Sequence, residues 1–426
     1  MFDLVDLLSK KQQAEVIEQK KITSVLFYQT QECQDLVLEA YRFEGIAAPA
    51  TAKNTDAQIA DHVRESDIEI VIVELNNSKD VSQDAERISH LLPNHASVIV
   101  VGSEDAISTI RNLKAMGFYY VFWPVTKQEF IDFVRSVYDN RQRSSHRGPG
   151  QKRRAKYISI LGSKGGVGAS FITAEVAYQL SAVRKTSCMV VEQNFHGGNL
   201  DVLMGIRKLE KRRIQQGSLA SSLDSAAAQS LVYKHTSMLS MLALTSDQLD
   251  TPSMIDYSNA VTDQLSEDVN FIVEDLSASV DFSLEADKFL SQADVVVLVM
   301  QPTVSSVREA ARLKDRVLKI NATPALRLIT VLNHTLGSKQ QTAGKEEAET
   351  ILNQPIDIEI PYCETLNATI LEDKRVVTSN LKAAEPIKRL TSLLLGETPT
   401  EQKPSLFSLA QSWFKQAKAS KGSNKS

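Results

Sequence analysis

The residues best suited to do chemistry lie in one short stretch at positions 161–170, which reads LGSKGGVGAS. The apolar run KYISI precedes it and the run FITAEVAYQLS follows it, an order that predicts a strand, a glycine-rich turn and a helix. Such a turn directs successive backbone N–H groups and a helix N-terminus at a polyphosphate. Gly165, Gly166 and Gly168 would allow the close approach that this requires. Ser170 stands where a hydroxyl group would bind Mg²⁺.

Further motifs follow this turn in a fixed order. They are SCMVVEQN, FIVEDLS, VLVMQPTVSSVREAARL, LITVLNH and IEIPY. Together with K-G-G-x-G-[KA]-S, they resemble the deviant Walker A (P-loop) family of MinD and ParA over about residues 155–396. The resemblance implies ATP and Mg²⁺ as ligands, and a homodimer in which Lys164 reaches the phosphates bound by the partner.

The same resemblance assigns the site residues. It places Asn333 at the adenine, Pro361 in the loop that closes on the base, and Ser170 with Asp275 at Mg²⁺. The complete set of candidate nucleotide-binding residues is Lys164, Gly165, Gly166, Val167, Gly168, Ala169, Ser170, Phe171, Asn333 and Pro361.

Three positions depart from the family pattern. Ala169 replaces a lysine that contacts the phosphates, and Glu192 and Asn194 stand where the second strand has two aspartates. An amide such as that of Asn194 cannot accept a proton from the attacking water. We therefore expect a nucleotide-binding protein with little or no ATP hydrolysis. Two alternatives remain open: an active ATPase that cycles on membrane or nucleoid, and a scaffold that binds no nucleotide.

The chain ahead of this region also alternates apolar strand-like runs with amphipathic segments. We therefore predict an α/β fold with two parallel sheets, a flavodoxin-like receiver-like one and a larger P-loop one. The expected organisation is an N-terminal amphipathic segment at 1–20, a receiver-like domain at 21–140, a basic linker at 141–155, a MinD/ParA-like domain at 156–396 and a polar tail at 397–426.

The first domain resembles a response-regulator receiver whose reactive residues are replaced. Glu74 stands at the position of the phosphorylatable aspartate, Ser103 near the hydroxyl position, and Trp123 at the position of the lysine. Gln29 and Thr30 occupy the places of the acidic metal ligands. A site without these groups should neither bind Mg²⁺ nor accept a phosphoryl group, so we expect a protein-binding or dimerising module. The alternative is that Glu74 mimics a phosphorylated state.

This pairing of domains resembles the TadZ/CpaE family of tight-adherence (Flp, type IVc) pilus assembly proteins. The resemblance implies a dimerising, ATP-binding localisation factor that places pilus or secretion machinery at the cell pole. It also implies pilus or secretion assembly proteins as partners.

Composition and charge limit the other partners. The net charge of -4 argues against nucleic-acid binding, although the stretch from 141 to 156 contains seven Lys or Arg and no acid. The opening run MFDLVDLLSKKQQ does not fit a secretory signal, and no apolar run approaches the ~18 residues of a membrane span. We expect a cytoplasmic protein with reduced cysteines.

The tail carries one more candidate element. Between positions 404 and 421, Leu, Trp and Phe side chains share one face of a possible helix while lysines lie elsewhere. Such a helix could hold the protein at the periphery of the inner membrane, dock on a partner or pack on the chain's own domain.

Overall fold

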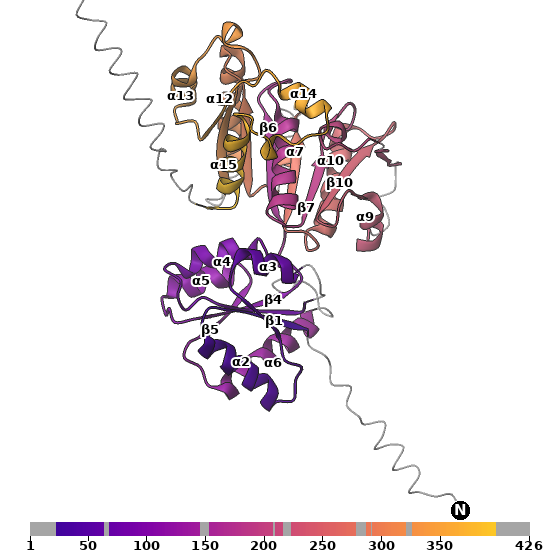
Figure 1. The fold of residues 1–426 in the computed structure, drawn as a ribbon. Helices are drawn as coiled ribbons and strands as arrows, with labels where there is room; N and C mark the ends of the chain where they lie inside the picture. Colours follow the sequence, from indigo (N-terminus) through magenta and orange to yellow (C-terminus); the bar gives the residue numbers. More distant parts are fainter. Residues whose placement is uncertain are drawn as a thin grey trace, which may run out of the picture.

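The structure is a computed structural model that describes residues 23–63, 68–144, 153–207, 209–215, 223–277, 287–290, 292–320 and 326–397. Figure 1 shows two α/β units, which are called the first unit (residues 23–144) and the second unit (residues 153–397). The expected N-terminal segment, residues 145–152 of the expected linker and the tail helix lie outside the described residues.

The first unit is built on a parallel sheet. Within the described residues this sheet has five strands in the order β2-β1-β3-β4-β5, which is the flavodoxin-like order. The strands are β1 (Ser24–Tyr28), β2 (Ala50–Lys53), β3 (Ile70–Glu74), β4 (Ser97–Gly102) and β5 (Phe118–Phe122). The helices are α2 (Gln31–Phe43), α3 (Asp56–Val63), α4 (Val81–Ser89), α5 (Ile107–Ala115) and α6 (Lys127–Ser144).

Helices cover both faces of this sheet, so its central strands are mostly apolar. Every residue of β3 is buried, and β-branched side chains occupy its first four positions because both faces of the strand pack against helices. Helices α2 and α6 pack on one face with Val37 and Phe130, while α3 and α4 pack on the other with Ile59 and Ile88. The predicted α/β class and parallel sheet are confirmed for this unit.

The second unit contains a larger sheet. Its described strands run in the order β14-β13-β12-β6-β11-β7-β10-β8, and β9 pairs with β10 outside this path. They are β6 (Lys156–Gly162), β7 (Cys188–Glu192), β8 (Arg212–Arg213), β9 (Tyr233–Lys234), β10 (Leu239–Thr245), β11 (Phe271–Leu276), β12 (Val295–Met300), β13 (Arg327–Asn333) and β14 (Ile358–Ile360). All the pairings described are parallel except the one between β9 and β10.

Helices also lie on both faces of the larger sheet. They are α7 (Ala169–Tyr178), α8 (Leu200–Leu203), α9 (Ser225–Leu231), α10 (Thr251–Leu265), α12 (Val304–Ile320), α13 (Lys345–Leu352), α14 (Leu366–Leu371) and α15 (Ala384–Leu394), with short turns η1 (Gln179–Val183), η2 (Ser338–Gln340) and η3 (Val376–Thr378). One core cluster joins α7 and α15 to the sheet through Ile172 and Ile387, and the other joins α10 and α12 to it through Ile255 and Val307.

Several strands differ from the sequence prediction. Strands β8, β9 and β10 correspond to none of the motifs quoted from the sequence, and β2 lies in no strongly apolar run. Strand β2 has the weak sequence ATAK, and its backbone pairs in register with β1. Backbone hydrogen bonds to a neighbouring strand therefore hold such a segment in the extended conformation, although its own residues have a low β-propensity.

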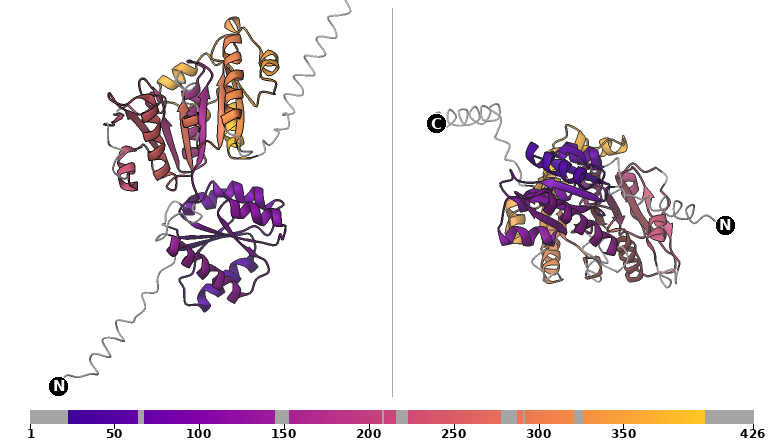
Figure 2. Two further views of the ribbon diagram at one scale, coloured as in Figure 1. Left: turned by 180° about the vertical axis from the view of Figure 1, so that it is seen from behind. Right: turned by 90° about the horizontal axis from the view of Figure 1, so that it is seen from below.

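The two units meet where the end of α4 contacts the beginning of the second sheet. The Asn270 side chain donates a 2.7 Å hydrogen bond to the carbonyl of Leu92, and the Asn94 side chain donates a 2.5 Å bond to the carbonyl of Val269. The rings of His90 and Phe271 lie 5.2 Å apart between centroids. Figure 2 shows this narrow junction from behind. None of the described helices has both the length and the apolar character needed to cross a membrane.

Candidate nucleotide site

The glycine-rich turn lies between β6, which ends at Gly162, and α7, which begins at Ala169. Gly166 has φ 81° and Gly168 has φ 91°, a left-handed region that favours glycine. A Cβ atom on Gly168 would also collide with the side-chain nitrogen of Asn333. The predicted strand, turn and helix are therefore present, and the turn requires glycine on steric grounds.

Asn333 joins this turn to a neighbouring strand. It is the last residue of β13, and its side-chain nitrogen donates a 2.9 Å hydrogen bond to the carbonyl of Val167. The side chain is therefore used to hold the turn, while its contact with adenine stays a prediction. Pro361 directly follows β14, the strand next to β13, so the two predicted residues lie at the ends of adjacent strands.

Three of the candidate residues direct their side chains into the protein. Val167, Ala169 and Phe171 are buried and belong to the core cluster that packs under α7. Only their backbone groups are therefore candidates for contact with a phosphate. Ala169 is 3 % exposed, so the chain has a buried residue where the resemblance expects a charged one.

Lys164 has a different environment from these three residues. Its side chain is exposed, and its Nζ atom donates a 3.2 Å hydrogen bond to the hydroxyl of Ser305 at the start of α12. The preceding Ser163 contacts α12 as well, because its hydroxyl lies 2.7 Å from that of Ser306. The start of α12 therefore supports the turn and leaves the Lys164 ammonium at the surface.

Two carboxylates lie at the ends of adjacent strands beside the turn. Asp275 on β11 and Glu192 on β7 are paired in register, and both are buried. Burial first, and then the charge of Glu192, raise the pKa of Asp275 to about 7, although a hydrogen bond from Ser170 acts in the opposite direction. Asp275 Oδ1 has no hydrogen-bond partner among the described residues. A carboxylate oxygen beside a hydroxyl suits Mg²⁺, so Ser170 and Asp275 fit the ion that the resemblance implies.

The sequence analysis missed Lys211. Its Nζ atom lies 2.6 Å from Glu192 Oε2 and donates a 3.2 Å bond to the carbonyl of Asn194. The ammonium therefore places a positive charge beside Glu192, the carboxylate that is paired in register with Asp275. No spacing in the sequence indicates this contact, because the lysine is distant from the phosphate turn along the chain.

Asn194 acts as a turn residue in this structure. Its side-chain oxygen accepts a 3.2 Å hydrogen bond from the backbone of Gly197. An amide used in this way has no capacity to take a proton from water. The arrangement therefore supports binding of phosphate and Mg²⁺ better than it supports proton transfer.

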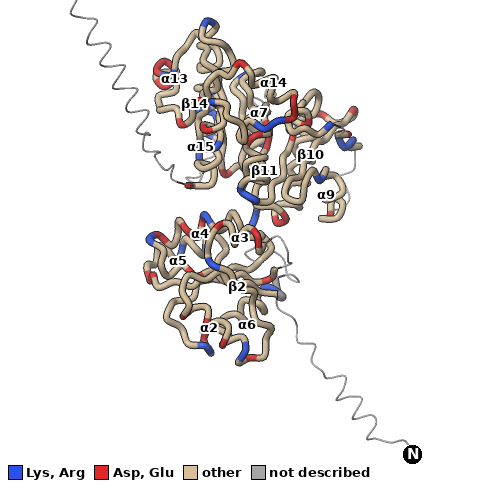
Figure 3. Tube along the Cα trace, viewed as in Figure 1, with Lys and Arg blue, Asp and Glu red and all other residues tan. Residues whose placement is uncertain are grey.

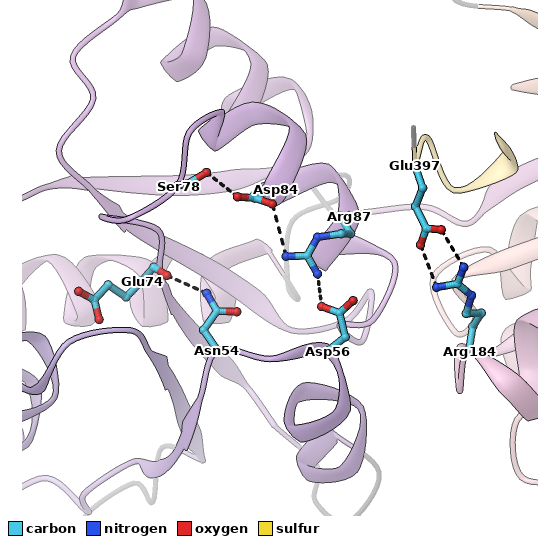
Figure 4. A network of polar contacts seen from close by, with 8 residues as sticks. All are labelled: Asn54, Asp56, Glu74, Ser78, Asp84, Arg87, Arg184 and Glu397. Carbon is cyan, nitrogen blue, oxygen red and sulfur yellow. Dashed lines mark hydrogen bonds and ion pairs between the residues drawn. The ribbon is translucent and has the colours of Figure 1, made fainter. Parts of the chain in front are cut away.

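The first unit has a separate polar centre at Glu74, the last residue of β3. Its Oε2 atom accepts bonds from the backbone N–H groups of Gln29 at 2.6 Å and Thr30 at 2.8 Å. Its Oε1 atom accepts bonds from the Thr30 hydroxyl at 2.6 Å and the Asn76 side chain at 2.9 Å. Asn54 donates to the Glu74 carbonyl, as Figure 4 shows. The carboxylate is thus fully bonded, and the sequence analysis missed both asparagines.

The other two predicted residues of this centre make no polar contact with Glu74. Ser103 is exposed just after β4, and Trp123 follows β5 and packs partly on the core under α6. Within the described residues, no group of three or more His, Cys, Asp or Glu side chains could hold a metal ion.

No protein-family model matches the sequence. An uncharacterized ATP-binding protein of Methanocaldococcus jannaschii is 26% identical over 243 residues, which cover 56% of this chain and 88% of that protein. The septum site-determining protein MinD of Helicobacter pylori is 27% identical over 254 residues, which cover 56% of this chain and 90% of that protein. The solved structure of MinD from Pyrococcus horikoshii, complexed with Mg-ADP, matches with 19% identity and a TM-score of 0.45, over 56% of this chain and 96% of that one.

The sequence relatives support a MinD/ParA-like class of P-loop ATP-binding proteins for this chain.

Proposed function

We propose that this protein is a dimerising, ATP-binding localisation factor that places pilus or secretion machinery at the cell pole, with weak or absent ATP hydrolysis. One observation carries the proposal. The phosphate turn keeps Lys164 at the surface and Ser170 beside Asp275, while the position that should serve hydrolysis holds the bonded amide of Asn194. The groups for binding are therefore in place and the group for proton transfer is not.

The chain's own groups would act on ATP as follows. Backbone N–H groups of the turn and the first turn of α7 hold the phosphates. Ser170 and Asp275 hold Mg²⁺, which supplies charge neutralisation when bound. Lys164 reaches a second copy of the chain, which makes dimerisation depend on the nucleotide. Asn333 keeps the turn in its glycine-dependent conformation.

The narrower family assignment is supported by the combination of units. A flavodoxin-like first unit, whose Glu74 carboxylate is saturated by four donors, precedes the P-loop unit. This combination is similar to that of the TadZ/CpaE pilus assembly proteins. A bonded glutamate cannot accept a phosphoryl group, so the first unit serves as a protein-binding module in this proposal. The tail at 404–421 would add contact with the inner membrane.

The direct test is calorimetric titration of Mg-ATP into the full-length protein, with light scattering to measure its oligomeric state. We expect saturable binding and ATP-dependent dimers in the wild type, and loss of the dimers in Lys164→Ala. Lys382→Ala is the matched control, because Lys382 is also an exposed lysine but belongs to the segment just before α15 and not to the turn. No saturable heat from folded wild-type protein would exclude nucleotide binding and favour the scaffold alternative.

The cellular part of the proposal has its own test. A fluorescent fusion should form polar foci that become diffuse in Lys164→Ala. Diffuse wild-type protein in cells that assemble pili would contradict the localisation role. Steady ATP turnover lost in Asp275→Asn would instead show an active ATPase.

A further inference from the structure

A cleft of about 700 Å³ lies between the two units, away from both polar centres described above. The ends of α4 and α5 line it from the first unit. The start of β6, with the residues just before β11 and β12, lines it from the second unit. Strand β6 begins at this cleft with Lys156 and ends at the phosphate turn with Gly162, so the two sites lie at opposite ends of the same strand.

The walls of this cleft carry more positive than negative charge. Its cationic lining residues are Lys114, Arg153, Arg154, Lys156 and Arg327. Its carboxylates are Glu86 and Asp294. Figure 3 shows basic positions gathered at the junction of the units.

Only part of this charge is neutralised. Arg154 pairs with Asp294 at 2.8 Å, and Lys156 lies 3.5 Å from Glu86. The remaining three cations, Lys114, Arg153 and Arg327, have no carboxylate partner among the described residues. Arg153 donates to backbone carbonyls such as that of Leu92 at 3.2 Å, and Arg327 donates to the carbonyl of Leu393.

The titration of the wall residues reflects this excess. Burial, together with the charges of the nearby Lys156, Arg153 and Arg327, lowers the pKa of His90 to about 3, so His90 is neutral at pH 7. Burial also lowers the pKa of Arg153 to about 10. Two buried wall atoms, His90 Nδ1 and Arg153 Nε, have no hydrogen-bond partner within the described part of the chain. An anion in the cleft would offset the repulsion among these cations.

We propose that this cleft binds a small phosphorylated ligand with a diphosphate-like anionic group. Three cations without carboxylate partners match the charge of such a group, and guanidinium and ammonium donors suit phosphate oxygens. The volume is within the range of small-molecule sites, roughly 300–1,000 Å³. Met116 and Ala155 give the cleft apolar surface for the rest of the ligand. Because residues of both units would hold it, the ligand would stabilise one arrangement of the units.

The test is calorimetric titration of inorganic pyrophosphate into the full-length protein, without nucleotide. Lys114→Ala should weaken binding about fivefold, since it removes one charge-assisted contact from an exposed side chain. Arg111→Ala is the matched control, because Arg111 is an exposed cation on the same helix that does not line the cleft. Glu86→Gln should tighten binding about twofold, because it removes a like charge from the wall.

Lys164→Ala separates this site from the phosphate turn. Unchanged pyrophosphate affinity in Lys164→Ala, with weaker affinity in Lys114→Ala, supports the cleft. Weakening in Lys164→Ala but not in Lys114→Ala would place the anion in the turn and overturn the proposal. Absence of saturable heat in the wild type would also overturn it. None of these outcomes depends on whether Mg-ATP binds. The proposed function and the proposed cleft site can therefore be contradicted independently of each other.

Discussion

Lys211 shows how a single side chain can alter a site that its own sequence context does not reveal. It lies beside Glu192, whose side chain is 1% exposed, and so neutralises a carboxylate that the protein interior would otherwise leave unpaired. Removal of one partner from a buried ion pair strongly destabilises the folded protein, because the other charge is left buried without a counter-charge. The lysine therefore has a structural role through its contact with Glu192.

This role predicts a stability change that does not depend on ATP. Lys211→Ala should lower the free energy of unfolding by about 2 kcal/mol, because it leaves Glu192 buried without a counter-charge. Adding Glu192→Gln to this variant should restore part of the loss. Chemical denaturation of the two variants measures the loss of stability in Lys211→Ala and its partial recovery in the double variant. Equal stability of wild type and Lys211→Ala would show that the contact contributes nothing.

Glu74 gives a second prediction at the scale of one residue. Glu74→Gln should lower the free energy of unfolding by about 2 kcal/mol, because an amide nitrogen would face backbone N–H donors that now bond to a carboxylate. Glu32→Gln is the control, since Glu32 is exposed in the first turn of α2. Urea denaturation of each variant provides the measurement. Similar small effects in both variants would mean that the charge of Glu74 is not needed.

At the scale of elements, the phosphate turn depends on the conformation of particular glycines. Gly168→Ala should destabilise the protein by about 2 kcal/mol, because its φ of 91° disfavours a side chain and its Cβ would meet the Asn333 side chain. Gly165→Ala should change stability little, because a Cβ there meets no atom within 4 Å. Thermal unfolding of the two variants makes the comparison. If both alanines are tolerated equally, the turn is less constrained than the structure indicates.

At the scale of the whole molecule, the junction of the units depends on a buried histidine. The pKa of His90 is lowered from 6.5 to about 3 in the folded protein, so the unfolded state binds more protons between these values. His90 therefore contributes stability that is complete above about pH 6.5 and is lost as the pH falls below it. By pH 5 the loss should reach about 2 kcal/mol.

His90→Phe should remove this pH dependence while it keeps an aromatic ring against Phe271. The measurement is the free energy of unfolding at pH 7.5 and pH 5 for wild type and variant. His62→Phe is the control, because His62 is at an intermediate depth and also contacts an aromatic ring, that of Phe27. An equal loss on acidification in the wild type and in His90→Phe would assign the effect to other groups.

The junction contains a further polar network. Figure 4 shows Arg87 bonded to Asp84 and Asp56 in the first unit, with Arg184 and Glu397 of the second unit nearby. A small pocket is lined by Asp56, Arg87, Arg184 and Glu397 together. Ion pairs from both units thus surround the contact made by the end of α4.

The sequence alone determined the features that depend on local order along the chain. Apolar runs predicted the central strands β3, β6, β11 and β12, because strands buried on both faces are mostly apolar. The glycines between β6 and α7 predicted the phosphate turn, because a glycine-rich turn between a strand and a helix is the arrangement that directs backbone N–H groups at a phosphate. Strands such as β2 were not predictable, because their residues have little preference for a strand. The backbone pairing with β1 makes β2 a strand.

The tertiary structure decided which distant side chains meet. The Lys211 contact with Glu192, the donors on Glu74 and the cationic cleft each join residues from separate elements. Pairing of charges and hydrogen bonds across a fold depends on distances in space, and no spacing in the chain encodes them. The sequence therefore determined the class of the site, and the packing of the elements decided its charges.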